Sequence, residues 1–274
     1  MIPFEPHPEV WALVVGVAAA YVAGVRRHHQ RTGERVAPMR IRSFVLGLVA
    51  MWIALDWPVD DVGDGSLLSV HMVQFLLLSV IAPLFLLRGC CPWLIERIVA
   101  VERVRAVAGV LRQPLIAVGV VSSVLIVSHI PEVVELYLTT DLIHLLMHAM
   151  WLASGFVLWW PLAAPASVAP VLSPLAQIAY LFVQSLAAII PAAWLTFSAT
   201  PIYPGYARSP KPAGMDAIID QQLAGILMKL GGGLLLWIAI GVIFFRWARQ
   251  EEAQMPPSRT VARATNRSAT NSPD

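Results

Sequence analysis

The sequence predicts an all-α fold, a polytopic membrane protein with seven transmembrane helices, its N-terminus outside and its C-terminus in the cytoplasm. Of the 274 residues, 58% are hydrophobic and only 13% are charged, whereas an ordinary soluble domain has about 45–50% apolar and about 25% charged residues. The apolar runs are too long for barrel strands, so helices, which satisfy their own backbone hydrogen bonds in lipid, are the expected spanning elements. The basic residues gather in alternate connections, which gives the orientation.

Seven apolar segments are the predicted spans. The first has no basic residues before it and no small-residue cleavage site, so we expect it to remain as an anchor. Pro83 should kink the third, and Trp159 and Trp160 should anchor the end of the fifth at the interface. The spans run approximately over Val10 to Val25, Ile41 to Trp57, Ser66 to Leu87, Pro114 to Ile130, Asp141 to Pro161, Leu172 to Phe197 and Asp216 to Phe245.

The connections between these spans are polar. The second span is followed by an acidic segment, Asp60, Asp61 and Asp64, which we expect to be a loop, and a second acidic loop follows the fourth span. Between Gly89 and Gln113, apolar residues recur at three- and four-residue steps, which predicts an amphipathic helix on the membrane surface. Residues 1–249 thus form the predicted transmembrane domain, and the polar residues 250–274 a disordered cytoplasmic tail.

The basic residues define the predicted orientation. Sixteen of the nineteen Lys and Arg residues lie in the first connection, the third connection and the tail, and only Arg208 and Lys211 lie on the opposite side. The positive-inside rule therefore places the tail in the cytoplasm. Lys229 lies within the last span, where we expect it to reach inward or to hydrogen-bond a neighbouring helix. The adjacent Cys90 and Cys91 should be free thiols on the reducing side.

Four histidines are predicted to share one thin layer at the outer ends of the spans. His71 begins the third span, His129 ends the fourth, and His144 and His148 lie in the first two turns of the fifth. Residues four apart lie on one face of a helix, so these last two imidazoles can converge on one ligand. Ionisable groups at membrane depth are costly unless partnered, so the layer is the candidate functional site.

The residue types in this layer point to a metal. Imidazole suits copper, zinc, iron and nickel, and thioether sulfur selects Cu(I); Met72 lies beside the histidines in sequence, and Asp220 enters the last span on the same side. For a lone residue such as His129, the alternative is an interfacial ring hydrogen-bonded to a backbone carbonyl. The predicted metal ligands are His71, His144, His148, His129, Met72 and Asp220.

Several sequence segments also carry a family resemblance. They are His71-Met72-Val73-Gln74 with its apolar run to Pro83, the His144 to His148 helix closing on Trp159-Trp160-Pro161, Tyr203-Pro204-Gly205-Tyr206, and Asp220-Gln221-Gln222-Leu223-Ala224-Gly225 with Met228. Up to about residue 249, the chain resembles the seven-span CtaG-like cytochrome c oxidase assembly factors. Where members of that family often have a second histidine after His-Met-x-Gln, this chain has Phe75.

The resemblance implies a protein of the bacterial inner (cytoplasmic) membrane, without enzymatic turnover, that helps mature a haem-copper oxidase by supplying copper to subunit I. The expected cofactor is copper, as Cu(I). The expected partners are the cytochrome c oxidase subunit and membrane lipid, with a periplasmic copper carrier and a second copy of the chain as further candidates, and no nucleic acid. Two alternatives stay open at this point. One is a haem-bearing membrane redox protein with histidine axial ligands, and the other is a transporter of copper or another ion.

Overall fold

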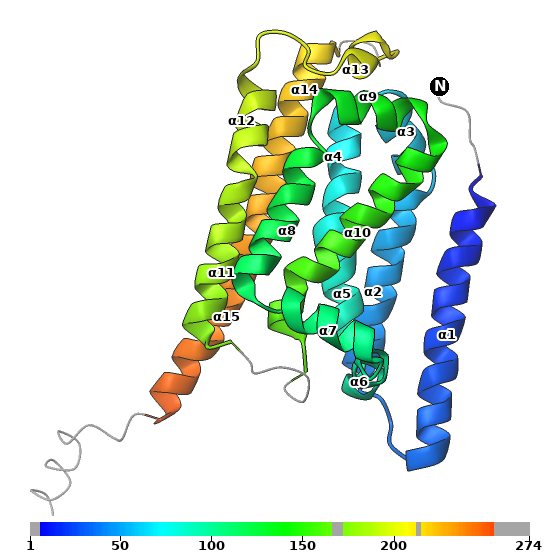
Figure 1. Ribbon diagram of the computed structural model, residues 1–274, viewed down its shortest axis with the longest axis vertical. Helices are drawn as coiled ribbons and strands as arrows, with labels where there is room; N and C mark the ends of the chain where they lie inside the picture. Colours follow the sequence, from blue (N-terminus) through cyan, green and yellow to red (C-terminus); the bar gives the residue numbers. More distant parts are fainter. Residues whose placement is uncertain (1–5, 166–171, 212–214, 255–274) are drawn as a thin grey trace, which may run out of the picture.

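The computed structural model describes residues 6–165, 172–211 and 215–254, and within these ranges the chain is all helical, as predicted. Six helices are long and apolar enough to cross a membrane, or up to seven if the bent pair α7 and α8 is one span. The helices α1 to α15 and two π-helical segments, η1 and η2, follow one another along a bundle (Figure 1). The fold is therefore a membrane helix bundle with six to seven candidate spans.

The first half of the bundle runs from α1 to α8. Its elements are α1 (Pro8–Thr32), α2 (Pro38–Leu55), α3 (Val59–Gly65), α4 (Leu68–Leu76), η1 (Leu77–Ile81), α5 (Ala82–Gly89), α6 (Pro92–Val99), α7 (Glu102–Leu111) and α8 (Pro114–Val127). The second half comprises α9 (Pro131–Thr139), α10 (Asp141–Ala163), α11 (Pro174–Ala187), α12 (Ile189–Phe197), α13 (Pro204–Arg208), α14 (Ala217–Ile226), η2 (Leu227–Gly232) and α15 (Gly233–Gln254).

Proline marks the beginning of many of these helices. Helices α1, α2, α6, α8, α9, α11 and α13 all open on a proline at their first position. A proline there loses no hydrogen bond, because the first N–H groups of a helix have no intrahelical acceptor, and its fixed φ suits the first turn. Short loops of non-helical residues therefore separate well-defined helices.

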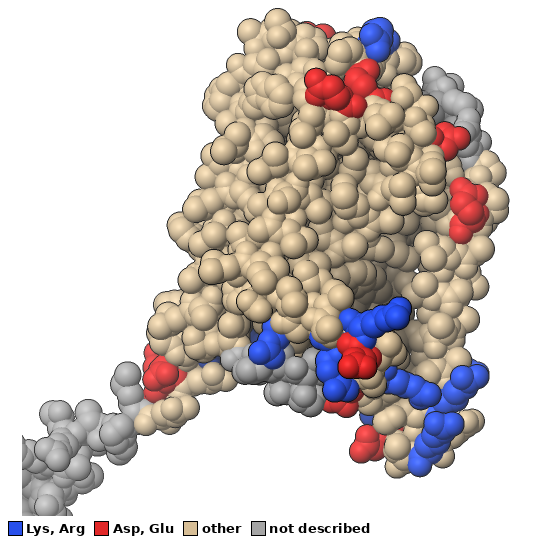
Figure 2. Space-filling model, viewed as in Figure 1, with Lys and Arg blue, Asp and Glu red and all other residues tan. Residues whose placement is uncertain are grey.

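The bundle has two chemically different ends. At one end, which we call the histidine end, the short helices α3, α9 and α13 lie beside the first turns of α4 and α10 (Figure 1). At the other, the arginine end, α6 and α7 lie across the bundle. Figure 2 shows most of the visible Lys and Arg side chains gathered at the arginine end, together with some acidic ones, whereas the charged side chains visible at the histidine end are mainly acidic. The charge asymmetry read from the sequence is thus a property of the folded surface.

Several boundaries differ from the prediction. Both acidic segments expected to be loops are helices, α3 and α9, and the amphipathic segment is two helices, α6 and α7. Helix α1 continues through the first basic residues to Thr32, and α15 continues to Gln254. The rest of the predicted disordered tail, from residue 255 onward, lies outside the described part of the chain.

The fourth predicted span is shorter than expected. Helix α8 has 14 residues, about 21 Å at a rise of roughly 1.5 Å per residue, whereas the hydrocarbon core is about 30 Å thick. It meets α7 at an angle of 88°. The count of six or seven spans depends on this pair alone, because Gln113 and the proline that opens α8 interrupt the apolar run.

The central helix α10 packs closely on η1. A Cβ atom placed on Gly155 would lie 2.4 Å from the carbonyl oxygen of Ser79, so only glycine permits this crossing. Four residues further along α10, the indole of Trp159 donates a hydrogen bond of 2.8 Å to the carbonyl oxygen of Val80 within η1. These contacts fix α10 along its length, and with it the position of its first two turns.

Two smaller predictions are confirmed. Cys90 and Cys91 are free thiols. The ammonium of Lys229, in η2, donates a hydrogen bond of 3.4 Å to the carbonyl oxygen of Ser185 on α11, which is a neighbouring helix as expected.

Candidate metal site

Two helices supply a cluster of four potential ligands at the histidine end. Asp60 and Asp64 lie on α3, and His144 and His148 lie on α10; one ligand atom from each lies within 4.8 Å of all the others. Each pair is spaced by four residues, so both members face the same way from their helix. The cluster is thus formed by two matching pairs that face one another.

The distances show how the groups are arranged. Oδ2 of Asp64 lies 3.0 Å from Nδ1 of His144. Oδ1 of Asp60 lies 3.7 Å from Nε2 of His144 and 3.8 Å from Nε2 of His148. The two imidazole rings meet edge to face, with centroids 4.3 Å apart. Asp60 therefore faces both rings, whereas Asp64 holds one ring from its other side.

Hydrogen bonds from neighbouring helices orient both carboxylates. The amide of Gln74 on α4 donates to Oδ1 of Asp60 at 2.5 Å and to the carbonyl oxygen of Ala54 at 2.9 Å. The hydroxyl of Tyr137 on α9 donates to Asp64 and lies 2.7 Å from Nδ1 of His71. A hydroxyl has one proton, so His71 must donate its Nδ1–H to Tyr137. Such outer partners fix the direction of metal ligands.

Burial keeps the Tyr137 hydroxyl in its donating form. Its pKa is raised well above the ordinary value, first by burial and then by the nearby Tyr206 and the negative charge of Asp64. The pKa of Tyr206, on the adjacent α13, is also raised by burial and by Asp64. Both phenols are therefore protonated at neutral pH. Tyr206 donates its proton to the carbonyl oxygen of Gly63 at 2.8 Å, which ties α13 to α3.

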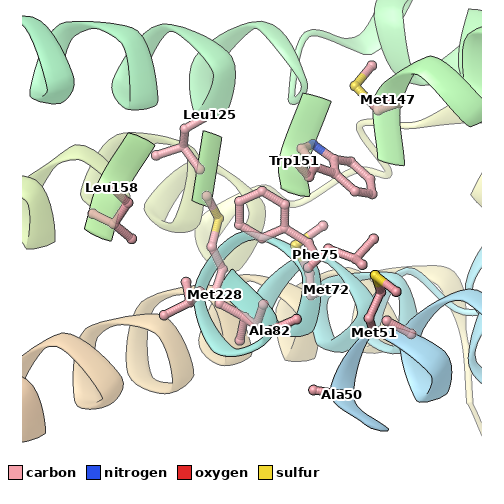
Figure 3. Packing of buried hydrophobic residues seen from close by; sticks show 14 of the residues in the cluster. Ala50, Met51, Met72, Phe75, Ala82, Leu125, Met147, Trp151, Leu158 and Met228 are labelled. Carbon is pink, nitrogen blue, oxygen red and sulfur yellow. The ribbon is translucent and has the colours of Figure 1, made fainter. Parts of the chain in front are cut away.

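Trp151 packs against the histidines from within α10. Its side chain is 1% exposed, and its ring centroid lies 5.1 Å from that of His71 and 5.4 Å from those of His148 and Phe75. Position 151 lies three residues after 148, so the indole continues the face that carries the imidazoles. Trp151 also belongs to the hydrophobic core, where it lies beside Phe75 (Figure 3), so its ring adjoins both the imidazoles and the apolar interior.

One donor atom in the cluster has no protein partner. Nε2 of His148 is buried, and among the described residues nothing accepts or donates a hydrogen bond to it. A buried polar atom left unpaired costs about 1–3 kcal/mol, so a bound group at this position would remove a penalty. The rest of the cluster is partly open, since 24% of the His144 side chain is exposed. The arrangement suits a cation that enters from the end of the bundle.

The other predicted ligands lie outside these four. His71 is adjacent, with Nδ1 3.6 Å from Oδ1 of Asp64 and its side chain 3% exposed. His129 directs Nδ1 to the carbonyl oxygen of Leu125 at 2.7 Å, which is the backbone-bonded alternative considered for it. Phe75, at the position where the resemblance suggested a second histidine, contacts the edge of the His129 ring at a centroid distance of 5.6 Å.

Met72 and Asp220 have structural roles, in core packing and in hydrogen bonding respectively. Met72 is 2% exposed and lies in the hydrophobic core (Figure 3). The Asp220 carboxylate, which is fully buried, accepts hydrogen bonds from the backbone N–H groups of Leu68 at 2.8 Å and Ser69 at 3.0 Å, and Nζ of Lys211 lies 3.1 Å away. Asp220 thus caps the first turn of α4 from a distant helix.

Sequence reasoning missed both carboxylates of the cluster, the residues Gln74 and Tyr137 that orient them, and Trp151, which packs against the histidines. One signal was available: Asp60 and Asp64 have the same four-residue spacing as His144 and His148. This spacing indicates a shared face only if the segment is helical, and a stretch with two glycines was expected to be a loop. The contacts of Tyr137 join residues 66 and 73 positions apart and have no local signature.

Long apolar helices around a partly buried histidine and aspartate cluster define a multi-pass membrane protein with a candidate metal site at one end. The chain belongs to the cytochrome c oxidase caa3 assembly factor family (Caa3_CtaG), whose model matches residues 19–250. This confirms the family predicted from the sequence segments, and the matched range includes all four residues of the cluster. Neither a curated protein nor a solved structure matches the chain.

Proposed function

We propose that this oxidase assembly factor binds copper at the periplasmic face of the bacterial inner membrane and assists its delivery to subunit I of a cytochrome c oxidase. The family supports the assembly role. The copper proposal rests on the convergence of His144, His148 and Asp60 and on the buried Nε2 atom of His148, for which the described residues offer no hydrogen-bond partner. Imidazole nitrogens with a carboxylate are a donor set that copper accepts.

The charge distribution supports the periplasmic location of the site. Lys and Arg gather at the arginine end (Figure 2), and basic connections remain on the cytoplasmic side of bacterial membranes. The cluster lies at the opposite end of the bundle, on α3 and the first turns of α10, near α9 (Figure 1). In this orientation copper reaches the site from the periplasm.

Partial exposure of the site suits delivery. A metal held by fully buried ligands exchanges slowly, whereas the His144 side chain is 24% exposed and the Asp60 side chain 15%. Ligands of a recipient protein can therefore approach the ion from the end of the bundle and displace these residues one at a time. The role is binding and transfer, and it needs no catalytic group.

The test is the double variant His144→Ala/His148→Ala, with His28→Ala/His29→Ala as its control. The control removes the same two side chains from the opposite end of the molecule, on α1. The purified protein should lose stoichiometric copper and cells should lose oxidase activity in the first variant only. Unchanged copper content in the folded first variant would overturn the proposal.

Two results would redirect the assignment to the alternatives drawn from the sequence. A Soret band in the purified protein would indicate a haem-bearing redox protein. Copper uptake into proteoliposomes would indicate a transporter.

A further inference from the structure

The donor atoms of the cluster are oxygen and nitrogen. Asp60, Asp64, His144 and His148 supply carboxylates and imidazoles. The sulfur atoms considered from the sequence belong to other surroundings. Met72 and Met147, which neighbour the histidines in sequence, lie in the hydrophobic core, and Cys90 and Cys91 lie at the arginine end, next to α6. Soft sulfur ligands select Cu(I), whereas carboxylate and imidazole suit divalent ions. The donor types therefore favour the divalent state of the metal.

The charges of the cluster also favour a divalent ion. With both imidazoles neutral, the two carboxylates give the cluster a charge of −2. In the described part of the chain the ion pairs of Asp60 and Asp64 are with histidines, and no Lys or Arg pairs with either. A divalent cation neutralises this charge, but a monovalent one leaves a net negative charge in a partly buried site, and uncompensated charge removed from water is costly.

The spacing allows three of the groups to bind one ion. Metal bonds of about 2.0–2.2 Å place neighbouring ligand atoms roughly 3 Å apart and opposite ones roughly 4.0–4.4 Å apart. Oδ1 of Asp60 lies 3.7 Å from Nε2 of His144 and 3.8 Å from Nε2 of His148, which falls between these values. Asp60 can therefore share one ion with either imidazole after small shifts of the side chains, and one ligand atom from each residue of the cluster lies within 4.8 Å of all the others.

Asp64 has a different role from that of Asp60. Its Oδ2 atom lies 3.0 Å from Nδ1 of His144, so that nitrogen is engaged and Nε2 faces Asp60. A carboxylate that accepts the second ring N–H of a ligating histidine fixes its tautomer and orientation and raises its basicity. Tyr137 holds the other oxygen of Asp64. Asp64 is thus placed to position a ligand rather than to be one.

We propose that the site holds copper as Cu(II), with Asp60, His144 and His148 as ligands and Asp64 as the positioning residue for His144. Three protein ligands leave coordination positions open to water or to a ligand of the recipient. This inference rests on the proposed function, since it specifies the oxidation state of the copper that the protein delivers.

The test compares the two oxidation states on the purified full-length protein in detergent, after removal of metal with EDTA. Cu(II) is titrated in air, and Cu(I) is titrated anaerobically against bicinchoninate. The wild type should bind Cu(II) more tightly than Cu(I), and its EPR spectrum should show a tetragonal Cu(II) signal with coupling to two nitrogens. This comparison needs no variant, so it does not depend on how any variant folds.

Three aspartate variants separate the roles. Asp64→Asn should lower Cu(II) affinity roughly 10–100-fold, the usual effect of a positioning residue, and Asp60→Asn should lower it further, with little change in Cu(I) affinity. Asp61→Asn is the matched control, because Asp61 lies in the same helix but faces His7 at 3.4 Å, and it should bind as the wild type does. Asp60→Glu keeps the charge and should retain Cu(II) with a changed EPR spectrum.

The outcomes distinguish this inference from the proposed function. Tighter binding of Cu(I) than of Cu(II), or equal affinities in the Asp60→Asn and Asp61→Asn variants, would overturn the inference while copper binding stands. Absence of binding in both oxidation states by the folded wild type would overturn both.

Discussion

Replacing Asp220 by alanine tests whether this residue is a helix cap or a metal ligand. The substitution removes the acceptor for the N–H groups of Leu68 and Ser69 and the carboxylate partner of Lys211, whose side chain is only 10% exposed. Removing one partner of a buried ion pair costs about 3–5 kcal/mol. Lys211 also donates to the carbonyl oxygen of Ser66, so we expect the lower limit, about 3 kcal/mol of unfolding free energy.

The matched control is Asp216→Ala. Asp216 caps α14 by accepting a hydrogen bond of 2.8 Å from the N–H of Ile219, but it is exposed, and loss of such a cap costs about 1 kcal/mol. Unfolding by denaturant in detergent, followed by the fluorescence of the ten tryptophans, measures both losses.

Copper content gives the second readout for this pair of variants. A cap predicts that Asp220→Ala binds stoichiometric copper wherever it is folded. Equal destabilisation by the two substitutions would refute the capping argument. Loss of copper from folded Asp220→Ala would instead support the ligand role that the sequence suggested.

Three further predictions concern the site, the core and the arginine end. Tyr137→Phe frees Asp64 from its hydroxyl partner and should lower copper affinity roughly 10–100-fold in a metal titration; an unchanged affinity would remove Tyr137 from the site. Gly155→Val places a side chain against the backbone of η1 and should lower the yield and thermal midpoint of folded protein, whereas Gly119→Val, which meets no atom within 4 Å, should not; equal behaviour would contradict the close crossing. Burial raises the pKa of the Cys90 thiol to about 11, so maleimide labelling of a Cys91→Ser variant should be slow at pH 7 and accelerate about tenfold per pH unit below that pKa, because the thiolate reacts. A rate that levels off near the ordinary thiol pKa of about 8.5 would show that burial does not raise the pKa of this thiol.

The sequence was sufficient for the features that membrane physics imposes locally. Spanning helices can be recognised by their length and hydropathy, because every backbone polar group in lipid must be paired within the segment. The pairing of His144 and His148 on one face of α10 also required only the helical repeat, and the structure has their rings in contact. These predictions rest on interactions between residues that are neighbours along one helix.

The carboxylate half of the site depends on contacts between distant segments. Helix α3 is held by Tyr206, whose hydroxyl reaches the carbonyl oxygen of Gly63 across 143 positions of sequence. Gly63 itself lies against α4, since a Cβ atom there would be 3.2 Å from the Cα atom of His71. Such packing turns a glycine-containing acidic stretch, whose intrinsic helix propensity is low, into a helix.

Asp220 illustrates the same limit for a single residue. Its position one turn into the last span and its depth matched those of the histidines, so sequence reasoning considered it as a ligand. Its hydrogen-bond partners in α4 are 151 and 152 positions away. Depth along a helix can be predicted from the chain, but the direction of a side chain toward one neighbour rather than another depends on how the helices pack.

Because the two pairs of side chains face one another from α3 and α10, the site depends on the alignment of these two helices. All four groups come from just these two helices, two from each at one-turn intervals. A slip of either helix by a single residue, about 1.5 Å along its axis, would carry both of its donors out of register together. Anything that pulls on α3 would therefore weaken the contacts of both of its carboxylates with the imidazoles simultaneously.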